Sequence, residues 1–414
     1  MRRMMALELK RVAKTRSTWL LSAGALLLST VMAFLVISFA RYYYLGENGK
    51  EASLSGMDAI QANREIAKPI EGQLTPEKIR TVFETYHKVY DAYGKDIPPE
   101  VYYEKIYPIS TILTRVREVY VDESTGVPLA YNEISPGDAA DFYQQRTVRL
   151  QNYMAYKYKG APDAQQQALA INGQVKTPFS YAYGVGDSDT SDYITFCIFL
   201  LVLICTVIAA PIFSAEYQSG ADDILRCTKH GRRRLAMVKL LSAVLLTAGL
   251  FTVCISAFLT ITYTAFGRDS LQTTLQVVRS AICFAPLTVG MVNTLTVLSG
   301  LLSFLATICF TLFLSTRLKN PVTTLVIAAG TCLLPTVLMF AGSGGNLESW
   351  LKFCLPSGGI GFGTGFYWEL TGFSFLRLGA SSVWTPYIIP VAAGIEAILF
   401  FILAICSYSR HEAS

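Results

Sequence analysis

The chain has 414 residues, of which 52% are hydrophobic and 16% are charged, and its formal net charge at pH 7 is +5. About a quarter of the residues of an ordinary soluble domain are charged, so this composition, with a mean hydropathy of +0.39, excludes that class and predicts an integral membrane protein. Cations that flank membrane spans account for the positive charge. They indicate membrane lipid as a partner and give no reason to expect nucleic acid.

Runs of about 20 apolar residues can cross the roughly 30 Å hydrocarbon core of a membrane as a helix. Six such runs predict an all-α polytopic membrane protein with six transmembrane helices. They lie near residues 19–40, 193–213, 240–265, 292–314, 321–341 and 386–407. The first run is too long for a signal peptide, and no small-residue cleavage site follows it, so we expect it to remain as an anchor.

The positions of Lys and Arg predict the orientation, because short loops rich in these cations stay in the cytosol. They gather before the first run, after the second and fourth, and behind the last: Arg2, Arg3, Lys10, Arg11, Lys14, Arg16, Arg226, Lys229, Arg232, Arg233, Arg234, Lys239, Arg317, Lys319 and Arg410. The opposite short loops hold only Arg268, Arg279, Lys352 and Arg377. We therefore expect both termini in the cytosol.

Residues 1–18 are expected to form a cytosolic interfacial helix. Met5, Leu9 and Val12 would lie on one side of it and the basic residues largely on the others, which is typical of a helix at the inner membrane surface. A plain basic anchor that only sets the topology is the alternative.

The segment 41–192 is long enough to bury its own core, and we expect a mainly α-helical extracytoplasmic domain there, between the first and second transmembrane helices. Its clearest helix is capped by Thr75, begins at Pro76 and is stopped by Gly94. Apolar residues recur along it at helical spacing: Ile79, Val82, Phe83, Tyr86, Val89, Tyr90 and Tyr93. Further helices are predicted after Pro99, with an interruption near Pro108, and over about 138–160. Strand signals are sparse.

All nine cysteines lie after residue 192, so the predicted domain has no disulfide, and no pair of them has zinc-ligand spacing, so we expect no metal site. The domain is rich in tyrosine. These rings could form a surface for a peptide or lipid-like ligand, or they could pack in the core and at helix rims.

The remaining segment, 193–414, is expected to hold transmembrane helices 2–6. The apolar run 281–314 is too long for one untilted span and contains Pro286, so it predicts either a kinked long helix or a half-entering segment before a full span. Two full spans would put Arg317 and Lys319 outside and are rejected. Glycines cluster in the outer region 342–384, where we expect a re-entrant or interfacial turn and not a dinucleotide site.

Glu396 stands near the middle of the last span. An ionisable side chain at that depth costs several kcal/mol unless it is paired or hydrated, so it should face the bundle or a pathway. A hydrogen bond to Ser or Thr of another span, a transport role and pairing across a dimer axis all stay open. We group Glu396 with Asn293 as candidates for a pathway or a buried pair.

Catalytic signals are missing from the chain. It has no G-x-x-x-x-G-K-[ST] phosphate loop and cannot be its own P-loop ATPase. Its three histidines, His87, His230 and His411, have no catalytic motif around them, so no catalytic residue is assigned.

The loop after the second run carries the most informative motif. It reads Glu216-Tyr217-Gln218-Ser219-Gly220-Ala221-Asp222-Asp223-Ile224-Leu225, and the basic run 229–234 and Lys239 follow it. Over about 211–246 this order of carboxylate, small residues, short amphipathic turn and cations resembles a cytosolic loop of exporter-type (type 2) ABC transporter permease subunits. Ala221 and Lys229 depart from that family, in which Thr and Pro are usual.

The resemblance implies that loop 214–239 docks on a separate cytosolic ABC ATPase. By resemblance, the contact or its support falls to Glu216, Tyr217, Ser219, Gly220, Asp223, Leu225, Arg232 and Arg233. Ser214 could cap the docking helix, with Glu216 near its positive end and Lys239 at the membrane boundary. Two ATPase copies would bind ATP and magnesium, this chain would bind no cofactor, and a second permease copy or a related permease would complete the pathway.

We therefore expect a permease subunit of an ATP-driven exporter in the cell membrane, and we expect that membrane to be a bacterial plasma membrane. The exporter would move an amphipathic substrate such as a peptide, an antimicrobial or a lipid-like molecule. Such a subunit belongs to an ATP-hydrolysing complex without being an ATPase. Two other classes stay open. One is a membrane receptor or sensor with a ligand-binding outer domain, and the other is an ion- or proton-coupled carrier that uses Glu396.

Overall fold

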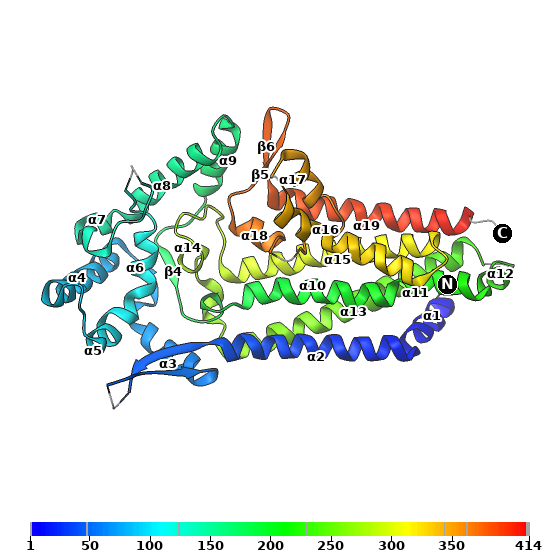
Figure 1. The fold of residues 1–414 in the computed structure, drawn as a ribbon, viewed down its shortest axis with the longest axis horizontal. Coiled ribbons are helices and arrows are strands. Elements are labelled where there is room, and N and C mark those ends of the chain that lie inside the picture. Colours follow the sequence, from blue (N-terminus) through cyan, green and yellow to red (C-terminus); the bar gives the residue numbers. More distant parts are fainter. Residues whose placement is uncertain are drawn as a thin grey trace.

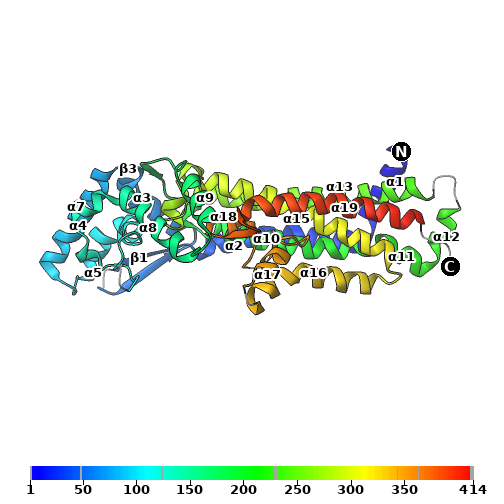
Figure 2. The ribbon, with the colours of Figure 1, turned by 90° about the horizontal axis from the view of Figure 1, so that it is seen from above.

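The computed structural model describes residues 2–46, 49–122, 125–227, 231–342, 344–361 and 363–410. Figure 1 shows an elongated molecule in which long helices run side by side along the long axis and a domain of shorter helices covers one end of them. The labelled chain ends, α1 (Arg2–Lys14) and α12 (Ala221–Arg226) lie at the opposite end. Figure 2 shows α1 and α16 on opposite flanks of the bundle.

Six helices of the described chain are long and apolar enough to span a membrane. They are α2 (Arg16–Phe39), α10 (Thr190–Ala209) with its continuation α11 (Pro211–Ser219), α13 (Arg233–Phe266), α15 (Val289–Arg317), α16 (Pro321–Ala341) and α19 (Thr385–Arg410). The six apolar runs of the sequence correspond to these helices in order, so the prediction of six membrane-length helices is confirmed.

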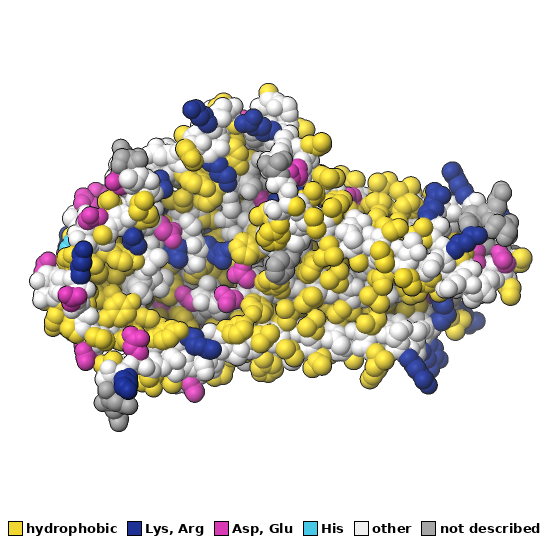
Figure 3. Space-filling model, viewed as in Figure 1, with side chains coloured by type: hydrophobic (Ala, Val, Ile, Leu, Met, Phe, Trp, Pro, Cys, Tyr) yellow, Lys and Arg dark blue, Asp and Glu magenta, His cyan; other side chains and the backbone are white. Residues whose placement is uncertain are grey.

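Helix α15 lies at the centre of the bundle, where it contacts α10, α11, α13, α16 and α19. Small side chains on it let neighbouring helices approach closely, which is how helices pack where lipid offers no hydrophobic driving force. At Gly300, for example, a Cβ atom would lie 2.7 Å from the Cδ1 atom of Ile198 on α10. On the face that Figure 3 draws, hydrophobic side chains cover the bundle, and Lys and Arg gather at the α12 end.

The domain at the other end is mainly helical. In chain order it contains β1 (Arg41–Leu45), β2 (Glu51–Ser55), α3 (Met57–Ala67), η1 (Lys68–Ile70), β3 (Gly72–Leu74), α4 (Pro76–Tyr93), α5 (Pro99–Val101), η2 (Tyr102–Ile106), η3 (Tyr107–Ile109), α6 (Ser110–Arg117), η4 (Tyr131–Glu133), α7 (Pro136–Ala140), α8 (Phe142–Lys157), α9 (Pro162–Asn172), β4 (Phe179–Tyr181) and η5 (Val185–Asp187). Helix α4 has the predicted bounds, and the Thr75 hydroxyl accepts a hydrogen bond from the Lys78 N–H. Tyr93, predicted to pack, is 45% exposed.

Sequence reasoning missed the short sheets. Strands β1 and β2 form an antiparallel pair in which Tyr42 faces Leu54, and β3 pairs with β4. The tyrosines at 42–44 favour a strand because aromatic side chains pack well on a pleated surface. These pairs add to the mainly helical domain without changing its class.

The domain also takes in segments from later in the chain. Between α13 and α15 lie η6 (Asp269–Gln272) and α14 (Leu275–Val278), and Val277 and Ala281 belong to the same core as residues of α4 and α6. Thr288 caps α15, so the segment 281–288 precedes the helix and does not continue it. The kinked long helix allowed by the sequence is therefore wrong.

The region 342–384 contributes α17 (Asn346–Phe353), α18 (Phe366–Thr371) and the hairpin of β5 (Phe375–Leu378) and β6 (Ser381–Trp384). Its aromatic residues share a core with α8 and with Phe284. Its backbone approaches α15 closely at Gly359, where a Cβ atom would lie 2.3 Å from the Ser303 hydroxyl oxygen. This region and the domain therefore pack as neighbours.

Candidate functional site

The motif that resembles a docking loop forms an elbow of two helices, α11 and α12, over residues 211–226. Gly220 joins them with a φ of 71°, a left-handed conformation that glycine adopts without steric cost. The prediction that Ser214 caps the docking helix is wrong, because Ser214 lies inside α11 and its hydroxyl donates to the Ala210 carbonyl at 2.8 Å. The short helix after the glycine is α12.

Glu216 fastens the base of the elbow to two other helices. Its carboxylate pairs with the ammonium of Lys239 on α13 and lies 3.5 Å from the Arg11 guanidinium on α1. Glu216 is 8% exposed and Lys239 1%, so both charged side chains are enclosed by the protein. Charges this deeply buried persist only when they are paired.

Arg11 extends this cluster to the surface of α1. Its guanidinium also pairs with Glu8. The hydrogen bond from Arg11 to Glu8 and the charges of Glu8 and Glu216 raise the pKa of Arg11 above its ordinary value, against the opposing effect of partial burial. Glu216 therefore supports the elbow from within the chain.

A second contact ties the tip of the elbow to the last long helix. The Tyr408 hydroxyl of α19 donates to Asp222 Oδ1 of α12 at 2.7 Å, and both residues are buried. The Tyr217 ring stacks on Tyr408, with centroids 6.4 Å apart, and its hydroxyl donates to the Thr316 carbonyl of α15. A displacement of the elbow would therefore act on α15 and α19 directly.

The rest of the elbow faces outward. Exposed positions among the predicted docking residues are Ser219, Gly220, Asp223, Arg232 and Arg233, whereas Tyr217 and Leu225 are half-buried. Ile224 stands between them and is 76% exposed. Lys229 and His230, like His411, lie outside the described residues.

Asn293 and Glu396 occupy different surroundings. Asn293, 1% exposed, accepts a hydrogen bond from the Ser191 hydroxyl at 2.7 Å and donates to the Tyr263 hydroxyl at 3.1 Å, so it links α10, α13 and α15. Glu396 is half-buried, and its buried Oε2 atom has no hydrogen-bond partner among the described residues. Within the described ranges, no hydrogen bond or ion pair joins these two residues, so they do not form a buried pair.

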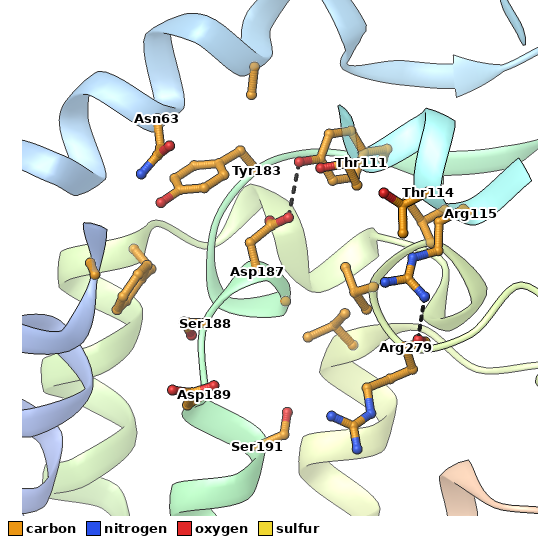
Figure 4. Close-up of a pocket in the computed structure, with 18 of the residues that line it drawn as sticks. Asn63, Thr111, Thr114, Arg115, Tyr183, Asp187, Ser188, Asp189, Ser191 and Arg279 are labelled. Atoms are coloured by element: carbon orange, nitrogen blue, oxygen red, sulfur yellow. Dashed lines mark hydrogen bonds between the residues drawn. The ribbon is translucent and has the colours of Figure 1, made fainter. Parts of the chain in front are cut away.

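A cavity of about 530 Å³ lies where the domain meets the bundle. We name it the junction cavity. Its wall combines the end of α2, α3, α6, the segment 181–192, α14 and the start of α15. Figure 4 shows Asn63, Tyr183, Asp187, Asp189, Arg115 and Arg279 around it. Sequence reasoning missed it because its wall comes from distant parts of the chain, and the only local signal was the run of aspartates at 187, 189 and 192.

Asp187 is the carboxylate at the centre of this wall. The Tyr181 hydroxyl donates to its Oδ1 at 3.0 Å and the Gly184 N–H donates to its Oδ2 at 2.9 Å. Its side chain is exposed to the cavity, and the protein surrounds that cavity. This enclosure raises the pKa of Asp187 to about 6, against the opposing effect of the two hydrogen bonds.

Two arginines of the wall are already engaged. Arg279 lies 3.6 Å from Asp192 and over the rings of Tyr367 and Trp368, at 4.9 and 5.2 Å. Arg115 pairs with Glu118 and donates to the Arg279 carbonyl at 2.6 Å. Figure 4 shows the second of these contacts.

Metal binding finds no support among the described residues, where no group of three His, Cys, Asp or Glu side chains could hold an ion.

Comparison with protein-family models finds no match, and comparison with curated proteins finds no similar sequence.

Proposed function

We propose that this chain is the membrane-spanning permease subunit of an ATP-driven exporter of the ABC type. The observation that carries the proposal is the elbow of α11 and α12. It puts an exposed apolar side chain, Ile224, on the short helix α12, while Glu216 fastens the elbow to α1 and α13 and Asp222 fastens it to α19. A partner that binds α12 would therefore act on these three helices at once.

The orientation follows the charges. Helix α1, Arg232 and the start of α13 carry exposed cations at the same end of the bundle as the elbow (Figure 3), and such an end stays in the cytosol during insertion. The proposal then puts both termini inside and the mainly helical domain outside the cell membrane.

The proposed cycle needs a separate ATPase on the cytosolic side. Two ATPase copies hold ATP and magnesium. The α12 helix of each permease inserts Ile224 into a groove of one ATPase, as an amphipathic helix enters an apolar groove. Closure of the ATPases moves α12, and the buried contacts of Glu216 with Lys239 and of Asp222 with Tyr408 transmit that movement to α13 and α19. A second copy of this chain, or a related permease, completes the pathway for an amphipathic substrate.

Two specific observations keep other classes in view. The junction cavity would also serve a receptor whose outer domain binds a ligand. The unpartnered Oε2 atom of Glu396 on α19 would serve a carrier that moves a proton or an ion. Neither class needs an ATPase.

The test is co-purification of the full chain with the phosphate-loop ATPase encoded nearest to its gene. Ile224→Asp puts a charge on the exposed tip of α12 and should abolish co-purification and coupled ATP hydrolysis in reconstituted vesicles. Val127→Asp is the matched control, because Val127 is an exposed apolar residue of the domain, 59% exposed. Wild-type binding by Ile224→Asp would refute the docking assignment, and a wild-type chain that retains no ATPase would favour the receptor or the carrier.

A further inference from the structure

The junction cavity is a built compartment between the domain and the long helices. Its volume of about 530 Å³ lies within the range of small-molecule sites, roughly 300–1,000 Å³. Carboxylates, hydroxyls and aromatic rings share its wall, as Figure 4 shows for Asp187, Asp189, Ser188 and Tyr183. A polar molecule of moderate size would fit such a compartment.

The charges of the wall do not balance. Arg279 is engaged by Asp192, and Arg115 by Glu118. The third arginine of the wall, Arg41, donates to the Ser38 and Ala40 carbonyls, which leave its charge in place, so one guanidinium stands against two unpaired carboxylates. Asp187 and Asp189 face the cavity, and neither forms an ion pair with any Lys or Arg of the described chain.

The aromatic residues of the wall favour the same sign of charge. Tyr107, Tyr181 and Tyr183 line the cavity beside the two carboxylates. The face of an aromatic ring attracts a cation within about 6 Å of its centroid. Carboxylates that lack a cation, next to tyrosine rings, form a wall that is complementary to an ammonium or guanidinium group.

We propose that the junction cavity binds an organic cation, a molecule with an ammonium or guanidinium group on a compact apolar body. Asp187 and Asp189 accept hydrogen bonds from the cationic group, and the tyrosine rings and Phe39 contact the body. A bare divalent ion does not suit the site, since the described acidic residues form no group of three that could hold a metal. The binding is independent of the proposed coupling to an ATPase, because a receptor would use the same site.

The test uses three probes with one skeleton and different charge: phenethylamine, 2-phenylethanol and 3-phenylpropionate. Binding to the purified full chain in lipid nanodiscs is measured by equilibrium dialysis. Phenethylamine should bind saturably and at least tenfold more tightly than the other two, because only its ammonium group forms charge-assisted hydrogen bonds with the two carboxylates.

Two variants and one control decide the site. Asp189→Asn should weaken phenethylamine binding about tenfold, and it leaves the fold intact, since the Asp189 side chain makes no capping hydrogen bond to α10. Asp187→Asn should have the same effect, and Asp91→Asn, on the exposed surface of α4, should have none. The proposal is overturned if phenethylamine only partitions into lipid without saturation, if 3-phenylpropionate binds as tightly, or if Asp189→Asn binds as wild type does.

Discussion

The buried pair of Glu216 and Lys239 predicts that its two single substitutions differ in cost. Glu216→Gln leaves the Lys239 ammonium, 1% exposed, without the carboxylate that neutralises it. Removing one partner of a buried ion pair costs about 3–5 kcal/mol, because the other charge stays in a medium of low polarity. We expect a loss of unfolding free energy in that range for Glu216→Gln.

Lys239→Met should cost less, about 1–3 kcal/mol. The reason is that Arg11 remains 3.5 Å from the Glu216 carboxylate and still offsets its charge. The Arg11 side chain is 50% exposed, so water screens this second partner and the compensation is incomplete. The double variant Glu216→Gln with Lys239→Met buries no charge at this point, and its cost should fall well below the sum of the two single costs.

The assay is equilibrium unfolding of the full chain in mixed micelles, followed by the signal of its helices. Glu84→Gln is the control, because Glu84 pairs with Arg80 on the exposed surface of α4 and its loss should cost less than about 1 kcal/mol. Equal costs for the two single variants, or strictly additive costs in the double variant, would refute the reasoning.

This expectation also changes how docking should be probed. Because the resemblance assigns Glu216 to the ATPase contact or its support, Glu216→Ala would be the direct choice for a docking variant. The structure puts Glu216 in a buried cluster of three helices, so that variant would mix instability with lost docking. Ile224 is the cleaner position because its side chain is exposed.

Two further predictions concern Tyr408 and Asp187. Tyr408→Phe removes the hydroxyl that donates to Asp222 and should cost about 1–3 kcal/mol of unfolding free energy. The control Tyr387→Phe, at a residue 58% exposed, should cost little. Equal melting temperatures of the two variants would contradict this prediction. The protein around Asp187 raises the pKa of its carboxyl to about 6, with Glu71 as a nearby like charge. Between about pH 4 and pH 6 the folded chain therefore keeps a proton that the unfolded chain releases. The free energy of unfolding falls as the pH rises through this range. The melting temperature of Asp187→Asn minus that of wild type should therefore rise between pH 4 and pH 6 and then level off, and a flat difference would exclude the raised pKa.

The elements that the sequence predicted well depend on local patterns. The six long helices follow from apolar length, and α4 follows from a cap, a proline and a glycine at fixed positions. The junction cavity could not be foreseen in this way. Its wall combines Asp187, Arg115 and Arg279, and these meet only because α6 and the segment before α15 pack on each other, through a hydrogen bond between residues 164 positions apart.

The pair of Glu216 and Lys239 is an intermediate case that sequence reasoning could have reached. The predicted spans ended at residue 213 and began again at 240, which left both charges in a loop. In the structure, the second membrane-length helix runs on through α11 to Ser219 and the third, α13, begins at Arg233, so both charges lie in consecutive members of the six long helices. A charge inside such a helix needs a partner of opposite sign, and here the next helix carries one at the same end of the bundle. If each predicted span is extended to its first charged residue, Glu216 and Lys239 become the natural partners of opposite sign. The hydrogen bond of Tyr408 to Asp222, 186 positions away, has no such local sign.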